Sequence, residues 1–179
     1  FTSLSSLGKI LNISWITPQM CVLFSSSMSE KRRFIDRLTL SIDYLHLNRV
    51  YRYEKLLRQR NKILMQSNFD HVWLDTIESQ ISELSIAITA RRLDLIEELE
   101  NLYKTELKNN SLTEYFPSVC IIIKGEIESL LIEKPAAEVE NYIKSQLKKS
   151  RSNYDLFIPG PNNASIEIFN KKNNNNIDI

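Results

Sequence analysis

Glycine is scarce in this sequence of 179 residues, which has only Gly8, Gly125 and Gly160. The phosphate-loop motif G-x-x-x-x-G-K-[ST], whose backbone N–H groups and lysine hold nucleotide phosphates, does not occur. The nearest match, Leu7-Gly8-Lys9, lacks the first glycine and the following serine or threonine, so we interpret it as a turn. An apolar run ending in Asp-Glu, which could hold magnesium, is also absent. We therefore expect neither tight ATP binding nor ATP hydrolysis by this chain alone.

Cysteine and histidine are equally rare. Cys21 and Cys120 lie far apart, which argues against a disulfide framework and fits a reduced, cytosolic compartment. His46 and His71 lack the spacing of metal ligands, so no metal site is expected. The N-terminal sequence FTSLSSLGKILNISW has no basic n-region or long apolar segment, so it does not resemble a secretory signal. No apolar run approaches the roughly 18 residues of a membrane helix, and a cytoplasmic protein is predicted.

Positive charge is balanced over the whole sequence but clustered locally. The net charge is +1, so the chain as a whole does not attract DNA, and any nucleic-acid binding needs a local patch. Arginine binds phosphate through paired N–H bonds, and each neutralised phosphate releases counterions. Two clusters are therefore candidate DNA contacts: Lys31, Arg32, Arg33 and Arg37, and then Arg49, Arg52, Lys55, Arg58, Arg60 and Lys62.

Two structural alternatives account for the same charges. The second cluster can form a solvated helix face, on which acidic neighbours make i,i+4 pairs such as Glu54–Arg58. In the first cluster, Arg32 and Arg33 can pair with Asp36 and hold a helix against the rest of the protein.

Hydrophobic spacing predicts three helices between residues 29 and 107, of which the last two form a helical hairpin. Ser29 is expected to cap a first helix and Asp43 a second, which ends near Met65. The second helix has an apolar stripe that Arg60 interrupts, formed by Val50, Tyr53, Leu57 and Leu64. A long helix, about 72–107, is expected to begin at Asp70 and to carry a coiled-coil-like seam of Leu74, Ile77, Ile81, Leu84, Ile88 and Leu95. The short connector makes these two helices antiparallel neighbours.

Strand-like segments lie on both sides of this hairpin. ILNISWI and CVLF precede it, and a strand beginning near Tyr115 follows it. Pro135 is expected to open another helix, which runs to about Ser150. A turn at Pro159-Gly160-Pro161 and a last strand at 166–169 come next, and the Asn-rich residues 171–179 are expected to be disordered. The order predicts an α+β fold with an inserted antiparallel helical-hairpin arm.

Several short segments, in this order and spacing, resemble one family. They are WITPQM at 15–20, SEKRRFIDR at 29–37, YEKLLRQRN at 53–61, Trp73-Leu74 with Glu78, and Gly160-Pro161. The sequence is similar to RecF, the bacterial DNA gap-repair family of the SMC/ABC ATPase class. The resemblance implies an α/β ABC-type ATPase head with a short helical arm. On that map, residues 1–24 end the N-terminal lobe, 25–110 form the arm, 111–170 return into the head and 171–179 form a tail.

The resemblance also implies a function for the full-length family. RecF proteins bind ATP with Mg²⁺, form an ATP-dependent head-to-head homodimer, associate with single-stranded and gapped double-stranded DNA, and work with RecO and RecR in repair and SOS induction. Gln19 falls where such ATPases have the glutamine that senses the γ-phosphate. The DNA-binding candidates, taken from the two basic clusters, are Lys31, Arg32, Arg33, Arg52, Arg58, Arg60 and Lys62.

The sequence also departs from the family pattern. Cys21 replaces an aspartate, and the turn that usually reads Gly-Pro-His-Arg-x-Asp is GPNNAS at 160–165. The family's phosphate loop would precede Phe1 and its Walker B segment would follow Ile179, so a central fragment is expected. A helical protein-interaction module without a DNA role, or a non-functional remnant of a decaying gene, are the alternatives.

Overall fold

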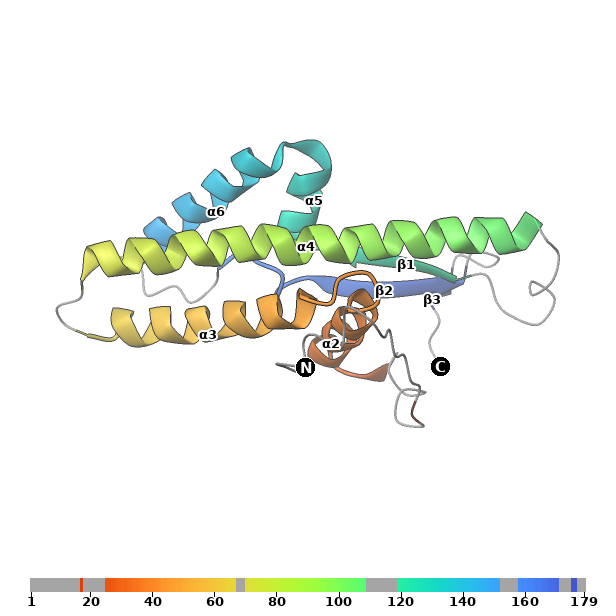
Figure 1. Cartoon of the computed structure of the whole chain (residues 1–179), viewed down its shortest axis with the longest axis horizontal. Helices are drawn as coiled ribbons and strands as arrows, with labels where there is room; N and C mark the ends of the chain where they lie inside the picture. The colour runs from red at the N-terminus through yellow and green to blue at the C-terminus, as the bar shows by residue number, and fades with distance from the viewer. Residues whose placement is uncertain are drawn as a thin grey trace, which may run out of the picture. The chain divides into compact units, whose positions relative to one another are not determined.

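The computed structural model describes Thr17 and residues 25–66, 70–108, 119–151, 158–170 and 175–176. The predicted strands before residue 25, Gln19 and most of the Asn-rich end therefore lie outside the described residues. The described elements form two compact units. One contains α2, the part of α4 from Arg91 onward and the β-sheet, and the other contains α3, the part of α4 up to Ala90, α5 and α6 (Figure 1).

The first unit is built on an antiparallel sheet. Strand β1 (Val119–Lys124) pairs with β2 (Ser165–Asn170), and β2 pairs with the two-residue β3 (Asn175–Asn176). β3 forms within the segment for which disorder was expected. Helix α2 (Met28–Thr39) and the later part of α4 (His71–Lys108) contribute to the apolar core of this unit. Its buried residues are Ile35, Leu95, Ile123, Ala164 and Ile166.

The second unit is helical. Helix α3 (His46–Leu64) runs antiparallel beside the first half of α4, and α5 (Glu126–Glu133) and α6 (Ala136–Ser150) complete the unit (Figure 1). The α3–α4 pair confirms the predicted helical hairpin. Its core includes the predicted seam of α4 from Leu74 to Ile88 and the apolar face of α6, which is Val139, Ile143 and Leu147. The architecture is thus mostly helical with a small antiparallel sheet.

The predicted N-terminal cap is correct for α4 but wrong for α2 and α3. Ser27, not Ser29, caps α2, because Ser27 and Glu30 form a reciprocal capping box. Asp70 begins α4 as predicted, since its Oδ1 accepts hydrogen bonds from the N–H groups of Val72 and Trp73. Asp43 does not cap α3: its side chain is buried and its Oδ2 lies 3.4 Å from Arg91 Nε.

Helix α6 begins directly after Pro135, as predicted. Helix α5 was missed, although its Ile127 is buried and its first turn is acidic, as suits a helix N-terminus. In the described parts of the chain, no helix is both long enough and apolar enough to cross a membrane.

Candidate nucleic-acid interface on helix α3

Helix α3 has one face buried in the second unit. Tyr53, Leu56, Arg60 and Ile63 follow a 3–4–3 spacing, and all four are buried. Side chains at this spacing share one side of an α-helix. The inward face of α3 is thus apolar except at Arg60.

Arg60 is a structural residue rather than a surface cation. It is 0% exposed, and its Nε donates to Glu78 Oε1 at 2.8 Å. Its Nη2 donates to the Leu147 carbonyl oxygen and to Ser150 Oγ, each at 2.8 Å. These bonds join α3, α4 and α6 within the unit. The expectation that Arg60 contacts DNA is therefore corrected, because its guanidinium is enclosed and already bonded.

Arg151 extends the same network toward the surface. It bonds Glu78 and also Asp75, whose Oδ1 lies 2.5 Å from Arg151 Nη2. The hydrogen bond from Arg151 lowers the pKa of Asp75 below its usual value. Burial acts to lower the pKa of Arg151, but its hydrogen bonds to Glu78 and Asp75 outweigh burial and raise it. Two acids of α4 are thus engaged by Arg60 and Arg151.

The opposite side of α3 carries a row of exposed residues, Tyr51, Lys55, Arg58 and Lys62, which we call the outer row. Their 4–3–4 spacing places them on one face, away from the buried residues. Arg58 Nη1 lies 3.7 Å from Glu54 Oε2, which confirms the predicted i,i+4 pair. Both side chains of this pair are largely exposed, at 61% and 45%. Such a pair contributes only about 0.3–0.5 kcal/mol, so a phosphate can compete for Arg58.

The charge balance of the hairpin favours anion binding by α3. This helix carries six cations and one carboxylate, Glu54, and removing the buried Arg60 leaves five cations. Arg52 belongs to this set, and its Nη2 donates to Gln80 Oε1 at 2.8 Å. Residues 71–90 of α4 contain no lysine or arginine. Up to Ala90, the lysines and arginines of the hairpin are therefore all on α3.

The first basic cluster lies in the other unit and divides differently. Arg32 Nη1 donates to the Ala164 carbonyl oxygen at 2.8 Å, which ties α2 to the start of β2. Burial, followed by repulsion from Arg92, lowers the pKa of Arg32, and Asp36 opposes this shift. Arg33 is exposed, whereas Lys31 and Arg32 are both half-buried, and Arg32 is the one bonded to the Ala164 carbonyl.

Asp36 has a different partner from the one expected. Its carboxylate accepts two hydrogen bonds from Arg92 of α4, from Nε at 2.8 Å and from Nη2 at 2.9 Å. Both side chains are buried. The predicted anchoring of α2 is therefore present, but Asp36 pairs with Arg92, and Arg32 contributes through the Ala164 carbonyl.

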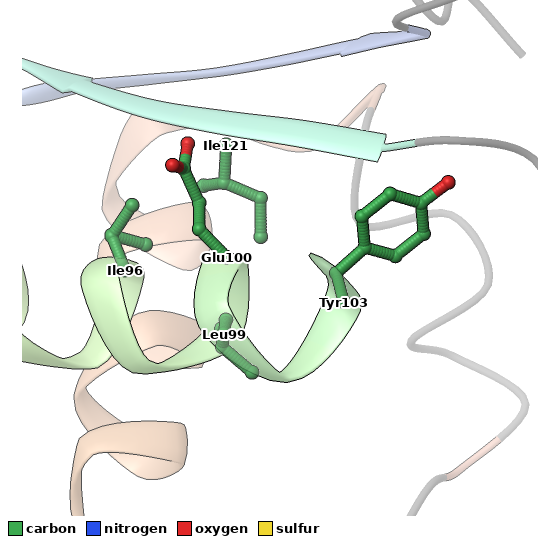
Figure 2. Close-up of a pocket in the computed structure, with 5 residues that line it drawn as sticks. All are labelled: Ile96, Leu99, Glu100, Tyr103 and Ile121. Carbon is green, nitrogen blue, oxygen red and sulfur yellow. The ribbon is translucent and has the colours of Figure 1, made fainter. Parts of the chain in front are cut away.

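A small hollow in the first unit has the wrong chemistry for a nucleotide. Ile96, Leu99, Tyr103 and Ile121 line it together with Glu100, and its volume is about 160 Å³ (Figure 2). Its charged lining group is a carboxylate, which repels phosphate. Among the described residues, no group of three or more His, Cys, Asp or Glu side chains is arranged to hold a metal ion.

Comparison with known proteins identifies the relatives of this chain. No family model matches the sequence. It is 36% identical over 149 residues to the DNA replication and repair protein RecF of Agrobacterium fabrum, covering 83% of this chain and 38% of that protein. RecF of Mesorhizobium japonicum is 35% identical over 141 residues, covering 79% and 36%. The chain is homologous to RecF.

Solved RecF structures share its fold. The structure described as the recombination mediator protein RecF-ATPrS in the RecFOR pathway superposes with a TM-score of 0.69 at 20% identity, covering 93% of this chain and 46% of that one. The corresponding RecF-ATP structure gives 0.61 at 19% identity, covering 87% and 42%. The chain thus spans less than half the length of the RecF proteins it matches.

Proposed function

We propose that this chain is part of a RecF-type DNA replication and repair protein and that the outer row of α3 binds DNA. The observation that carries the proposal is the uneven charge of α3. Five cations and one carboxylate remain on this helix once the buried Arg60 is set aside. Homology to proteins named for DNA replication and repair supplies the class of ligand.

The proposal gives the remaining cations distinct roles. Arg58 and Lys62, with Lys55, make direct phosphate contacts because they share the outer face. Arg52 lies at the flank, where its bond to Gln80 orients it. Lys31 and Arg33, in the other unit, are a secondary set of contacts, whereas Arg32 remains committed to the Ala164 carbonyl.

The proposed setting is the cytoplasmic RecF protein as a whole. There, the α3–α4 hairpin is the arm of an ABC-type ATPase head, and residues 111–170 belong to that head. ATP with Mg²⁺ drives homodimerisation, and RecO and RecR are the partners at single-stranded and gapped DNA in recombinational repair and the SOS response. Support comes from the shared fold with RecF solved in the RecFOR pathway.

Salt dependence of DNA binding tests the proposal. We compare the chain with a triple variant, Lys55→Ala, Arg58→Ala and Lys62→Ala, by fluorescence anisotropy on a labelled single-stranded oligonucleotide. The plot of log K against log salt falls with a slope of about −0.7 per phosphate contact on single-stranded DNA. Loss of three contacts should therefore make the slope of the triple variant less steep by about 2.

A matched control removes the same charge elsewhere in the same unit. It carries Lys134→Ala, Lys144→Ala and Lys149→Ala, on or beside α6. The control should keep the parent slope. Equal slopes for the two triple variants, or no binding by the parent chain at low salt, would contradict a DNA-binding role for the outer row.

A further inference from the structure

The outer row contains one aromatic residue. Tyr51 is 64% exposed, whereas Tyr53, two positions later, is 1% exposed and belongs to the core. Tyr51 therefore contributes little to packing of the unit. Single exposed apolar residues are common on protein surfaces, so exposure alone assigns no role to it.

The neighbours of Tyr51 distinguish it from an ordinary surface residue. Lys55 lies one turn away on the same face, and Arg58 and Lys62 continue the row. With a rise of 1.5 Å per residue, the row extends about 16 Å along the helix from Tyr51 to Lys62. It thus presents a ring at one end and three cations beyond it.

This arrangement suits unpaired nucleic acid better than duplex. Proteins that bind single strands combine a track of cations, which follows the phosphates, with aromatic rings on which bases stack. In a duplex the bases are already stacked and paired, so they offer no free face to the ring. The cations serve both ligands, but the ring serves only the single strand.

We infer that Tyr51 stacks on an unpaired base of single-stranded DNA whose phosphates follow Lys55, Arg58 and Lys62. The inference rests on the proposed function and specifies which residue of the outer row favours unpaired DNA. The phenol ring is the essential part, and its hydroxyl is not.

Three substitutions at Tyr51 separate ring, bulk and hydroxyl. Tyr51→Phe keeps the ring, Tyr51→Leu keeps apolar bulk without a ring, and Tyr51→Ala removes both. Affinity is measured for a poly-dT oligonucleotide and for a duplex with the same number of phosphates, at one salt concentration. The Ala and Leu variants should bind the single strand at least about fivefold more weakly, while the Phe variant binds it like the parent. Duplex affinity should change less than about twofold in all three.

A second exposed aromatic provides a matched control. Trp73 is 56% exposed in the first turn of α4, which has no lysine or arginine nearby in sequence. Trp73→Ala should leave single-strand affinity within about twofold of the parent. A loss equal to that of Tyr51→Ala would show that exposed aromatics act here without the cation row, and would overturn the assignment.

The outcomes also separate this inference from the proposed function. If the Lys55, Arg58 and Lys62 variant loses salt dependence but Tyr51→Ala binds the single strand like the parent, stacking fails and the DNA surface stands. If Tyr51→Ala weakens single strand and duplex equally, the ring has no preference for unpaired bases and the inference is also refuted. If the triple variant behaves like its control, the DNA surface itself fails.

Discussion

Arg58 and Arg60 are two residues apart in sequence but should respond to mutation in opposite ways. Arg60 is 0% exposed and bonded to Glu78, to the Leu147 carbonyl and to Ser150, whereas the Arg58 side chain is 61% exposed. We expect Arg60→Met to reduce stability without a direct effect on DNA affinity. Arg58→Ala should instead weaken DNA binding and leave stability almost unchanged.

The size of the Arg60 effect follows from its contacts. Removing one partner of a buried ion pair costs about 3–5 kcal/mol, because the other charge is left without compensation. Arg151 still bonds Glu78 after the substitution, and Arg60 Nη1 has no hydrogen-bond partner in the native structure. Both facts favour the lower end, about 3 kcal/mol. For a chain of 179 residues, this corresponds to a decrease in Tm of roughly 6–12 °C.

Urea unfolding followed by circular dichroism at 222 nm measures this loss. Arg58→Ala, the matched control, should change the free energy of unfolding by less than about 0.5 kcal/mol. Adding Glu78→Leu to Arg60→Met should recover only a small part of the loss, because it removes the buried carboxylate that has lost Arg60 but also takes a partner from Arg151. A cost below about 1 kcal/mol for Arg60→Met, or DNA affinity lost at Arg60 and kept at Arg58, would refute the assignment of inner and outer faces.

Two further predictions concern the second unit. Gly160→Ala would place a Cβ 2.3 Å from Tyr53 Oη, and overpacking of this kind costs about 1–3 kcal/mol of folding stability. Tyr53→Phe removes that oxygen, and the next atom, Cζ, lies at 3.5 Å from the Cβ position. In a double-mutant cycle, most of the penalty should therefore vanish in the Tyr53→Phe background. An undiminished penalty would exclude this clash as its cause. The hydrogen bond to Glu126 raises the pKa of Tyr142, so its stabilising contribution is complete below about pH 10 and is lost as pH rises through the folded-state pKa. Absorbance at 295 nm, compared between parent and Tyr142→Phe, should show this phenol titrating above about 10, and a lower midpoint would contradict it.

Local signals made much of the fold predictable. The seam of α4 from Leu74 to Leu95 is buried as its 3–4 spacing indicated. Asp70 and Pro135 mark the starts of α4 and α6. Both signals can be read from the sequence, because an N-cap bonds the next few N–H groups and proline restricts its own φ. The α3–α4 hairpin then follows from a short connector.

Pairings between distant residues were harder to predict. Asp36 bonds Arg92, 56 positions away, although Arg32 and Arg33 are its neighbours in sequence. Local spacing carries no information about which cation reaches a buried carboxylate from another element. Helix α5 was missed for a different reason: eight residues contain too few turns for a clear periodic pattern.

Position around the helix axis distinguishes the buried cation of α3 from the exposed ones. Arg60 lies at 3–4 spacing from Tyr53, Leu56 and Ile63, and so has the phase of the core rather than of the outer row. Its interruption of the apolar stripe was visible in the sequence, and a cation in such a position requires a buried acid, which Glu78 provides. Counting cations along α3 therefore overestimates the proposed DNA-binding surface, because the count includes the buried Arg60. Assigning each cation a phase first leaves Lys55, Arg58 and Lys62 as the proposed phosphate contacts, with Tyr51 in line with them.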